Sequence, residues 1–304
     1  MTSPYHEQAR LQTLKPALEF RSRILTAIRG WFASQNFTEV ETPVRLSTPA
    51  LELHIDAEPS GVAFLRTSPE LHMKRLLAAG YEKIFQMGPC FRQGERGSLH
   101  NPEYTMLEWY RADSNYLDIL NDTETLLSHI SALPQLSTLK SQILPPPPWP
   151  RFTIRELFIT HAGWDPVASF DTDRFEADLV AKVEPALPRN IPVFVMDYPA
   201  PAAALSRRKP GDEKIAERWE LYINGIEIAN AFSELTDSTE QRQRFEECAR
   251  ERKSAGRTVY DLDEAFLSAL KLGMPPSGGV ALGVDRLVMV LAGKSSLDDI
   301  MAFR

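Results

Sequence analysis

The amino-acid sequence predicts an α+β fold in which an antiparallel sheet is flanked by helices. Two observations support this prediction. Extended runs within residues 83–110 and 218–235 come in pairs joined by short polar links, which is the pattern of β-hairpins. Helical patterns, as at residues 17–35 and 238–254, stand apart from these pairs and do not alternate with single strands. Hairpin-linked strands with helices to the side are typical of α+β proteins.

The composition excludes several classes of protein. The chain has 304 residues, of which 43% are hydrophobic and 25% are charged, as in globular proteins. No run of about 18 apolar residues occurs, and the N-terminus lacks the apolar core of a signal peptide, so we expect no membrane span. Cys90 and Cys248 lack metal-type spacing, which favours the cytoplasm over a zinc site or a disulfide framework. The net charge of −7, with no basic stripe, argues mildly against nucleic-acid binding.

The first third of the chain predicts a helix, an extended segment and a strand that leads into a second helix. Residues 17–35 repeat their apolar side chains at helical spacing, and Asn36 can end this helix in a left-handed conformation. The segment TEVETPVRL should be extended, because Pro43 excludes a helix and favours a sheet edge. The stretch AFLRTSPEL reads as a strand that enters a helix over residues 71–79, which Gly80 ends.

The hairpin strand in HNPEYTMLEWY carries an unusual mixture of side chains. A half-buried strand should alternate apolar with polar residues. Here each side of the strand combines a carboxylate with aromatic rings: Glu103, Thr105, Leu107 and Trp109 share one side, and Tyr104, Met106, Glu108 and Tyr110 share the other. The sequence therefore raises the question of what a fold does with a carboxylate and a phenol among apolar neighbours.

The middle of the chain predicts a helix over residues 115–133, a proline-rich spacer and a small helical region. We interpret LPPPPWP at residues 144–150 as a stiff spacer within one domain, and a domain boundary is the alternative. A capping-box pattern from Thr153 to Glu156 begins the helical region, which runs to about residue 187. The run IPVFVMDYP after it predicts a buried strand.

The last third contains the clearest local signal, the hairpin RWELYINGIEIANAFSEL around the turn Asn224-Gly225. With this turn, Glu220 should pair with Ala229, and Glu227 should lie diagonally from Glu220 on the same face. Two carboxylates so close repel each other unless a cation separates them, and Mg²⁺ suits such a pair together with phosphate oxygens. A solvated face of an edge hairpin is the alternative interpretation.

Three polar and aromatic residues of the same hairpin, Asn230, Phe232 and Glu234, have the opposite parity along the strand. They can serve the same pocket as the two glutamates only if a bulge near Ala229 re-aims the strand. A surface strand with one buried phenylalanine is the alternative. Charged helices at residues 238–254 and 264–272 follow.

Two arginines fit the recognition of phosphate. Arg92 follows a strand and precedes the flexible loop QGERGSL, and its planar fork matches phosphate oxygens. Arg286 opens the last helix after the strand GGVALGV, where a helix N-terminus also favours an anion. Gly283 lets a ligand approach that backbone closely. A purely structural strand–helix junction is the alternative for this glycine-rich segment.

Three stretches, NFTEVETPV, FRQGERGSLHNPEYTMLEWY and GGVALGVDRLVM, resemble motifs 1, 2 and 3 of the class II aminoacyl-tRNA synthetases in order and spacing. Within that family, TSPELHMKRLL and GIEIANAFSEL resemble the catalytic core of lysyl-tRNA synthetases. The resemblance covers about residues 15 to 304 and implies the class II catalytic fold. Because about 15 residues precede the first catalytic helix, we expect one catalytic domain over residues 1–304, with a helical insertion at about 151–187 and no anticodon-binding OB domain.

The stretches HNPE-TMLEWYR, GIE-AN-F-ELTD and GVALGVDRLVM are similar to a truncated branch of that family, the elongation factor P–(R)-β-lysine ligases. That branch activates (R)-β-lysine with ATP and transfers it to a lysine ε-amine of elongation factor P. The resemblance implies ATP and Mg²⁺ as cofactors, a lysine-like substrate, elongation factor P as the acceptor and a homodimer built through motif 1. It does not imply tRNA as a substrate.

The resemblance also implies roles for individual residues. Arg92 and Arg286 would be catalytic and would hold the phosphates. The ATP site would further contain Gln93, Gly94, Glu95, Asn101, Tyr104, Glu227, Ile228 and Gly283. Glu220 and Glu227 would bind Mg²⁺. The amino-acid pocket would contain Ser68, Pro69, Glu70, Glu108, Tyr110, Asn230, Phe232, Glu234 and Ala281. A substrate ammonium needs charge-assisted partners in a desolvated site, which carboxylates and a phenol supply.

Ala281 favours the truncated branch, because lysyl-tRNA synthetases have a glycine at the matching position. One added methyl reshapes the pocket by about as much as moving an amino group from the α to the β carbon. Two alternatives remain open on the sequence: a minimal synthetase-like enzyme that charges tRNA or another amine with α-lysine, and an inactive regulatory paralogue.

Overall fold

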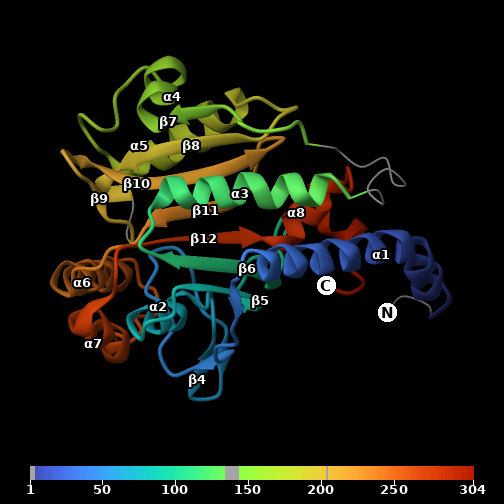
Figure 1. The fold of residues 1–304 in the computed structure, drawn as a ribbon, viewed down its shortest axis with the longest axis horizontal. Coiled ribbons are helices and arrows are strands. Elements are labelled where there is room, and N and C mark those ends of the chain that lie inside the picture. The colour runs from blue at the N-terminus through green and yellow to red at the C-terminus, as the bar shows by residue number, and fades with distance from the viewer. Residues whose placement is uncertain (1–3, 134–143, 203–204) are drawn as a thin grey trace.

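The computed structural model describes residues 4–133, 144–202 and 205–304. Within these residues, nine strands form one sheet: β1 (Thr38–Glu39), β5 (Lys83–Phe91), β6 (Glu103–Ala112), β7 (Arg151–Thr153), β8 (Val193–Pro199), β9 (Arg208–Lys209), β10 (Asp212–Ile223), β11 (Ile226–Ser233) and β12 (Ser277–Gly283). Their order is β1-β5-β6-β12-β11-β10-β8-β7, with β9 beside β10, and all pairs except β1–β5 and β7–β8 are antiparallel (Figure 1). A smaller sheet contains β2 (Arg45–Leu46), β4 (Ala63–Leu65) and β3 (Pro59–Ser60). The predicted fold class is confirmed.

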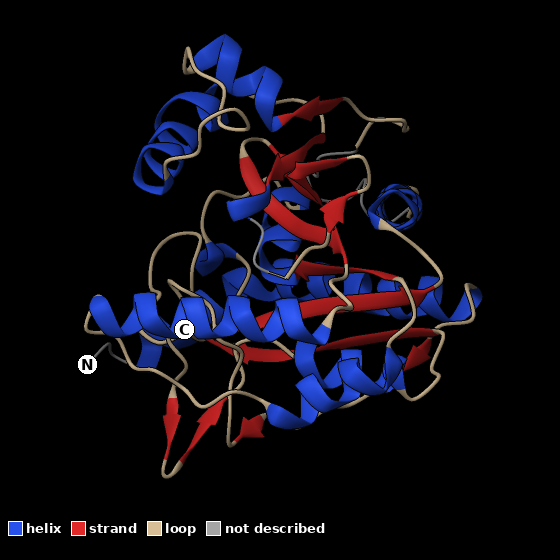
Figure 2. Ribbon diagram, turned by 90° about the vertical axis from the view of Figure 1, so that its left-hand side faces the viewer, coloured by secondary structure: helices blue, strands red, loops and turns tan. Residues whose placement is uncertain are grey.

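Helices cover both faces of the large sheet (Figure 2). They are α1 (Pro4–Ser34), α2 (Glu70–Ala78), α3 (Tyr116–Ser131), α4 (Ile154–His161), α5 (Thr172–Asp178), α6 (Ser238–Ser254), α7 (Glu264–Gly273) and α8 (Val284–Leu291), with short turns at Leu179–Val183, Glu184–Ala186, Ala200–Ala202 and Leu297–Asp299. The main apolar core packs α1, α3 and α8 against one face of the sheet. A second cluster joins α2, α6 and α7 on the other side. In the described ranges, no helix has the length and apolarity that a membrane crossing requires.

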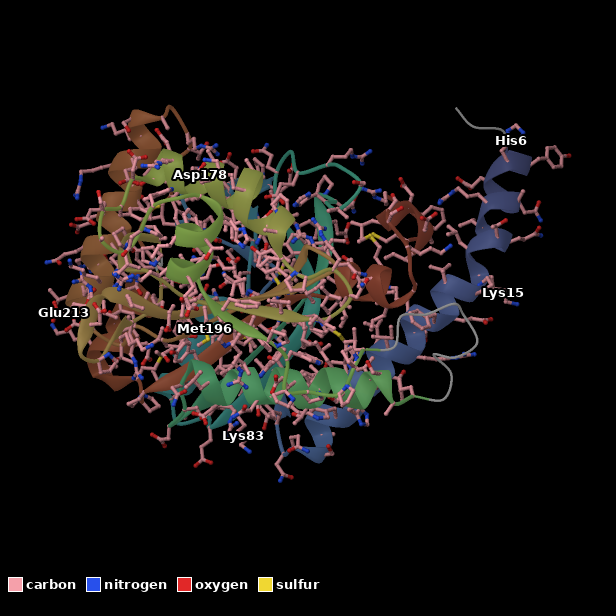
Figure 3. All side chains as sticks on the ribbon, turned by 90° about the horizontal axis from the view of Figure 1, so that it is seen from above. His6, Lys15, Lys83, Asp178, Met196 and Glu213 are labelled. Carbon is pink, nitrogen blue, oxygen red and sulfur yellow. The ribbon has the colours of Figure 1, made fainter. Side chains whose placement is uncertain are left out.

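Helix α1 is longer than the sequence predicted. It begins at Pro4 and continues through Pro16, where a proline removes one backbone donor without ending the helix. The first turns carry His6 and Lys15 and project beyond the rest of the chain (Figure 3). Further along, Phe20, Ile24 and Phe32 are fully buried against the sheet. Asn36 ends the segment at a positive φ of 60°, as predicted.

The β5–β6 hairpin resolves the mixed character of the strand in HNPEYTMLEWY. Leu107 and Trp109 point into the main core, where Trp109 lies edge-on to Phe32 at 5.4 Å between ring centroids. Each such fully buried large apolar side chain contributes about 1.5–3 kcal/mol to the free energy of unfolding. The other side of β6, with Glu108 and Tyr110, faces a cavity on the opposite side of the sheet. One side of the strand therefore builds the core and the other side builds a site.

The β10–β11 hairpin has the predicted turn but not the predicted register throughout. Tyr222 pairs with Glu227, yet Glu220 pairs with Asn230, and the expected partner Ala229 pairs with Leu221. The reason is a bulge that leaves Ile228 as an extra residue. This is the bulge near Ala229 that the sequence required for both sets of polar residues to share one face. Beyond it, Phe232 lies opposite Arg218 on that face.

Local caps begin α3 and α4. Thr153 and Glu156 form the predicted capping box of α4, and Asn115, for which no cap was predicted, caps α3 with a reciprocal bond to Asp118. Helices α4 and α5 pack with β8 into a third apolar cluster at the far end of the sheet. In the proline-rich spacer, Trp149 stacks on Phe194 at 6.1 Å between ring centroids. The spacer is thereby joined to the main core, which includes both rings.

We expect Gly278→Ala to destabilise the protein. A Cβ on Gly278 in β12 would lie 2.7 Å from the carbonyl oxygen of Asn115 and 2.7 Å from the side chain of Ile119, and the backbone oxygen cannot yield freely. Overpacking of this kind costs about 1–3 kcal/mol in the free energy of unfolding, which urea titration measures. Gly30→Ala is the control, because open space surrounds Gly30 within α1 and alanine favours a helix. Equal stability of G278A and the unaltered protein would contradict this packing.

Candidate active site

A cavity of about 1020 Å³ lies on the face of the sheet opposite α1 and α3. Its wall combines β6, β11 and β12, the starts of α2 and α8, part of α6 and the loop at residues 51–55. Most residues that the sequence singled out line it: Ser68, Glu70, Arg92, Glu95, Asn101, Tyr104, Glu108, Tyr110, Glu227, Ile228, Asn230, Phe232, Glu234, Ala281, Gly283 and Arg286. Segments far apart in the chain therefore meet in one site.

Four of the singled-out residues do not line the cavity. Gln93 and Gly94 are exposed in the turn after β5, where Gly94 has a φ of +76° and the Gln93 N–H donates to the Asp56 carbonyl. Pro69 begins α2 and accepts two backbone N–H groups of its first turn. Glu220 lies on the cavity face of the sheet, directly opposite Asn230, where Arg218, Tyr198 and Tyr222 enclose its carboxylate. Gln93, Gly94 and Pro69 therefore belong to backbone turns next to the site.

Glu108 stands at the acidic end of the cavity floor. Ser68 Oγ donates to its Oε1 at 2.7 Å, and the Tyr110 hydroxyl donates to its Oε2 at 2.8 Å. The side chain is 1% exposed. Burial, reinforced by the charge of Glu70, raises the pKa of Glu108 to about 8 despite these two hydrogen bonds. A cation that enters here would ionise this carboxyl group.

Lys74 is an internal cation that sequence reasoning missed. Its Nζ lies 2.5 Å from Glu70 Oε1 and 2.5 Å from Glu234 Oε2, and 5.3 Å from the centroid of the Phe232 ring. Burial lowers the pKa of Lys74, but Glu234 and Glu70 outweigh it and raise the pKa overall. Burial likewise raises the pKa of Glu234. The i,i+4 spacing of Glu70 and Lys74 in TSPELHMKRLL was the available signal.

Gly279 provides the room for this acidic end. A Cβ at Gly279 would collide with the Tyr110 ring and with Glu234 Oε1. Two residues further along the same strand, Ala281 of β12 lies directly opposite Glu108 of β6. Glycine at one position and alanine at the other therefore set how close the pocket side chains come to the sheet.

The opposite end of the cavity is cationic. The Arg92 guanidinium lies 5.2 Å from the centroid of the Tyr104 ring and 3.8 Å from Glu95, and its Nε is buried without a hydrogen-bond partner in the described chain. The Tyr104 hydroxyl donates to the Thr67 carbonyl at 2.8 Å, which fixes the ring. A flat guanidinium beside a fixed ring can receive an anionic group together with a planar base.

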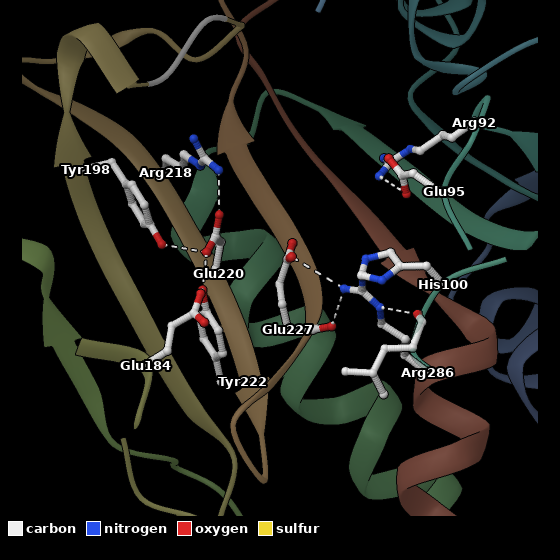
Figure 4. Close-up of polar contacts among 11 residues, drawn as sticks. Arg92, Glu95, His100, Glu184, Tyr198, Arg218, Glu220, Tyr222, Glu227 and Arg286 are labelled. Carbon is white, nitrogen blue, oxygen red and sulfur yellow. Dashed lines mark hydrogen bonds and ion pairs between the residues drawn. The ribbon is translucent and has the colours of Figure 1, made fainter. Parts of the chain in front are cut away.

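Arg286 crosses from α8 to β11 and to the loop before β6 (Figure 4). It donates to the carbonyl oxygens of Glu227 at 3.0 Å and Leu99 at 3.3 Å, and its Nη2 lies 2.6 Å from His100 Nε2. Burial and the charge of Arg286 lower the pKa of His100, so its neutral ring accepts this bond. His100 was not predicted as a site residue, although it begins the stretch that the sequence singled out.

Glu220 and Glu227, the predicted metal pair, differ in their surroundings (Figure 4). Tyr198 and Tyr222 donate to Glu220 Oε2 at 2.6 and 2.7 Å, and Arg218 lies 2.5 Å from Oε1. The Glu227 carboxylate lies 3.5 Å from Arg286, and burial together with the charge of Glu220 raises the pKa of Glu227. Within the described residues, no three His, Cys, Asp or Glu side chains form a metal cage on their own.

Arg218 is a further site residue that the sequence did not reveal. It lines the cavity, donates from Nε to Asn230 Oδ1 at 3.1 Å and pairs with Glu220. Its guanidinium also lies 4.4 Å from the centroid of the Tyr198 ring. Arg218 therefore links the Asn230 amide to the Glu220 carboxylate on the same face of the sheet.

Comparisons with known proteins show the family to which this chain is similar. The family model described as tRNA synthetases class II (D, K and N) matches residues 2–304. A protein of Hamiltonella defensa named elongation factor P–(R)-β-lysine ligase is 37% identical over 315 residues, and one of Erwinia tasmaniensis with the same name is 40% identical over 303 residues; each alignment covers 93% of both chains. A lysine–tRNA ligase of Pelotomaculum thermopropionicum is 37% identical over 322 residues, which is 95% of this chain and 63% of that protein.

We expect Lys74→Met to lower the free energy of unfolding by about 3–5 kcal/mol at pH 8, because it leaves buried carboxylates without their cation. The loss should be smaller at pH 5, since burial raises the pKa of Glu234 and the protonated group tolerates burial. Urea unfolding at both pH values measures this. Lys271→Met on the exposed side of α7 is the matched control. If K74M matched the unaltered protein at pH 8, the internal ion cluster would not contribute to stability.

Proposed function

The chain belongs to the class II tRNA synthetases of the D, K and N group, and from this membership we propose that it is an ATP-dependent ligase that joins (R)-β-lysine to elongation factor P. Relatives that bear this ligase name are 36–40% identical to the chain and span 93% of it. The observation that carries the proposal is a single cavity with a carboxylate-rich end and an arginine-rich end. An amino acid with two ammonium groups fits the first end, and a triphosphate fits the second.

The charges at the acidic end match a diammonium substrate. When Glu70, Glu108 and Glu234 are all ionised, Lys74 compensates one of the three charges and two remain. A lysine isomer brings an ammonium at each end of its carbon chain, so both remaining charges can be paired. Ala281, where lysyl-tRNA synthetases have glycine, adds a methyl opposite Glu108. This difference supports the β isomer over α-lysine as the substrate.

The first step forms an aminoacyl-adenylate. The substrate carboxylate attacks the α-phosphate of ATP in line, the new O–P bond forms, and the bond to pyrophosphate breaks. Arg92 stabilises the charge that develops on the α-phosphate, and Arg286 lies where it can hold the outer phosphates. Tyr104 offers a fixed ring for the adenine. Positioning and charge neutralisation account for the step without a covalent enzyme intermediate.

The second step transfers the amino acid to the protein acceptor. The ε-amine of an elongation factor P lysine attacks the carbonyl carbon of the adenylate, an amide bond forms, and AMP leaves with the electrons of the broken C–O bond. The acidic pocket keeps the amino acid in place while its carboxyl group, at the cationic end, reacts. The acceptor needs access only to this reacting centre.

Mg²⁺ fits the two glutamates at the cationic end. The charge of Glu220 contributes to the raised pKa of Glu227, and a divalent cation between the carboxylates relieves that repulsion. Glu227, whose carboxylate has only the long contact of 3.5 Å to Arg286, would supply one ligand, and Glu220 would contribute the remaining lone pair of Oε1 beside Arg218. Bound there, Mg²⁺ supplies charge neutralisation for the phosphates.

We further propose that the protein is a cytoplasmic homodimer and that residues 1–304 make up one catalytic domain with a helical insertion at about 151–187. The continuous sheet from β1 to β7 supports a single domain. The motif 1 resemblance at residues 36–44 supports the dimer, because this segment builds the dimer interface in class II synthetases. The net charge of −7 supports a protein acceptor over tRNA.

The proposed function is tested by incubating the protein with ATP and each lysine isomer, with elongation factor P or tRNA as the acceptor. We expect mass spectrometry to show elongation factor P heavier by one (R)-β-lysyl group and tRNA unchanged. Arg92→Ala should lower ATP–pyrophosphate exchange by about 10²–10³-fold while the protein stays folded. Charged tRNA with unmodified elongation factor P would instead identify a lysyl-tRNA synthetase-like enzyme.

We expect substrate binding at pH 7 to release protons from the protein. Burial raises the pKa of Glu108 to about 8, so the group is mostly protonated in the empty pocket and ionises when an ammonium arrives. Titration calorimetry in two buffers of different ionisation enthalpy counts these protons, and the apparent affinity should rise from pH 6.5 to 8.5. Glu108→Gln should bind more weakly and release fewer protons.

The same shift affects the stability of the empty protein in the opposite sense. A carboxyl group with a raised pKa stabilises the folded state fully below its ordinary value of 4.5. That contribution is lost as the pH rises from 4.5 towards about 8. An E108Q variant should therefore show a flatter dependence of unfolding free energy on pH over this window. A dependence equal to that of the unaltered protein would contradict the assignment of the proton to Glu108.

A further inference from the structure

Glu52 is a carboxylate in the cavity for which neither step above has a use. It lies in the loop at residues 51–55, which lines the cavity. The side chain is partly buried, yet its carboxylate forms no hydrogen bond or ion pair with any residue that the structure describes. Burial raises the pKa of Glu52 to about 6, with Arg92 and Arg252 opposing and Glu70 and Glu95 reinforcing the shift. An unpaired carboxylate that titrates near neutrality is suited to moving a proton.

The loop that carries Glu52 is held rigidly. Arg252 of α6 is fully buried and donates to the carbonyl oxygens of Glu52 at 2.5 Å and Ile55 at 2.8 Å, and it pairs with Asp56 at 2.5 Å. Asp56 also pairs with Arg257 at 2.9 Å. Two arginines thus fix the backbone at Glu52 and on its C-terminal side. A base held in this way needs no rearrangement before it acts.

The loop of Glu52 lies beside the turn that follows Arg92, since the Gln93 N–H donates to the Asp56 carbonyl at 2.8 Å, and Glu52, Glu70 and Arg92 line the same cavity. Glu70 marks the amino-group end of the bound amino acid, and Arg92 marks the α-phosphate. The carbonyl carbon that the acceptor attacks lies between these two groups, and Glu52 is close enough to both to be shifted by their charges. Lys74 and the two substrate ammonium groups already balance the carboxylates of the pocket. The charge of Glu52 is therefore left for a third ammonium.

We propose that Glu52 is the general base that accepts a proton from the attacking nitrogen of the acceptor lysine. The proposal rests on the proposed function and adds a residue to its second step. An acceptor ammonium carries three protons, and the amide product keeps one. One proton must leave before the nitrogen lone pair can attack, and a second leaves as the C–N bond forms and the C–O bond to AMP breaks. Glu52 accepts the first proton, which frees the lone pair, and passes it to solvent; the second proton leaves to water.

Glu52→Gln keeps the size of the side chain and removes its basicity. We expect ATP–pyrophosphate exchange, including the KM for (R)-β-lysine, to stay within about twofold of the unaltered protein. Single-turnover transfer from preformed adenylate to elongation factor P should slow by about 10²-fold. In the unaltered protein this transfer should quicken as the pH rises through about 6, where Glu52 loses its proton, and E52Q should lack that rise. Glu251→Gln, an exposed residue of the same cavity wall, is the matched control.

Hydroxylamine separates a base from a structural residue. It is uncharged at neutral pH and attacks without losing a proton first, so the adenylate on E52Q should react with it at the rate of the unaltered protein. Butylamine, a protonated alkylamine like the lysine side chain, should react more slowly on E52Q. This comparison still tests Glu52 if elongation factor P receives nothing from the unaltered protein, a result that would overturn the proposed function alone.

Two results would overturn the role of Glu52. A KM for (R)-β-lysine raised more than tenfold in exchange, with unchanged transfer from the adenylate, would make Glu52 a ligand of the substrate amino group. Unchanged exchange and unchanged transfer to both elongation factor P and butylamine would show that no proton passes through it.

Discussion

Burial of three carboxylates around one lysine is the interaction on which the site depends. Removing a charge from water costs several kcal/mol, and only close partners offset it. Lys74, 2.5 Å from both Glu70 and Glu234, makes the cluster possible before any substrate arrives. Glu70 and Lys74 belong to α2, and Glu234 directly follows β11. The ion cluster therefore holds the start of α2 against the sheet. The same ion cluster stabilises the fold and shapes the pocket.

The bulge at Ile228 is the geometric counterpart of that cluster. Without it, residues before and after Ala229 would point to opposite faces of the sheet, because side chains alternate along a strand. The extra residue places Glu227 on the same wall as Asn230 and Phe232. One strand therefore serves the cationic end of the cavity with its first residues and the acidic end with its last. The bulge therefore lets a single strand contribute side chains to the sites of both substrates.

Features that depend on neighbours in sequence could be predicted, and features that depend on distant partners could not. The turn at Asn224-Gly225 and the capping box at Thr153 follow from local hydrogen bonding, so the sequence was sufficient for them. The register beyond the turn was wrong by one residue, because tertiary pairing imposed the bulge.

The predictions of site residues succeeded and failed for the same reason. The spacing of motifs identified the residues that touch ligands in the related family, and most of these residues share the cavity. Lys74, His100 and Arg218 were missed because their importance comes from partners on other segments, such as Glu234, Arg286 and Asn230. A charged residue inside a helix resembles any surface residue until the fold shows that it is buried.

Selectivity follows from the same buried charges. An amino acid with an apolar side chain would leave Glu108 and Glu234 facing a surface that offers no proton donor, and unpaired buried polar groups are costly. Glu108 can escape part of that cost by staying protonated, since burial raises its pKa to about 8. A diammonium substrate pairs with both carboxylates, so they can be ionised without that cost. An amino acid with an apolar side chain leaves the cost in place and therefore binds more weakly. The carboxyl groups of the empty pocket therefore lack a cationic partner for their full charge, and the pocket selects the substrate that supplies it.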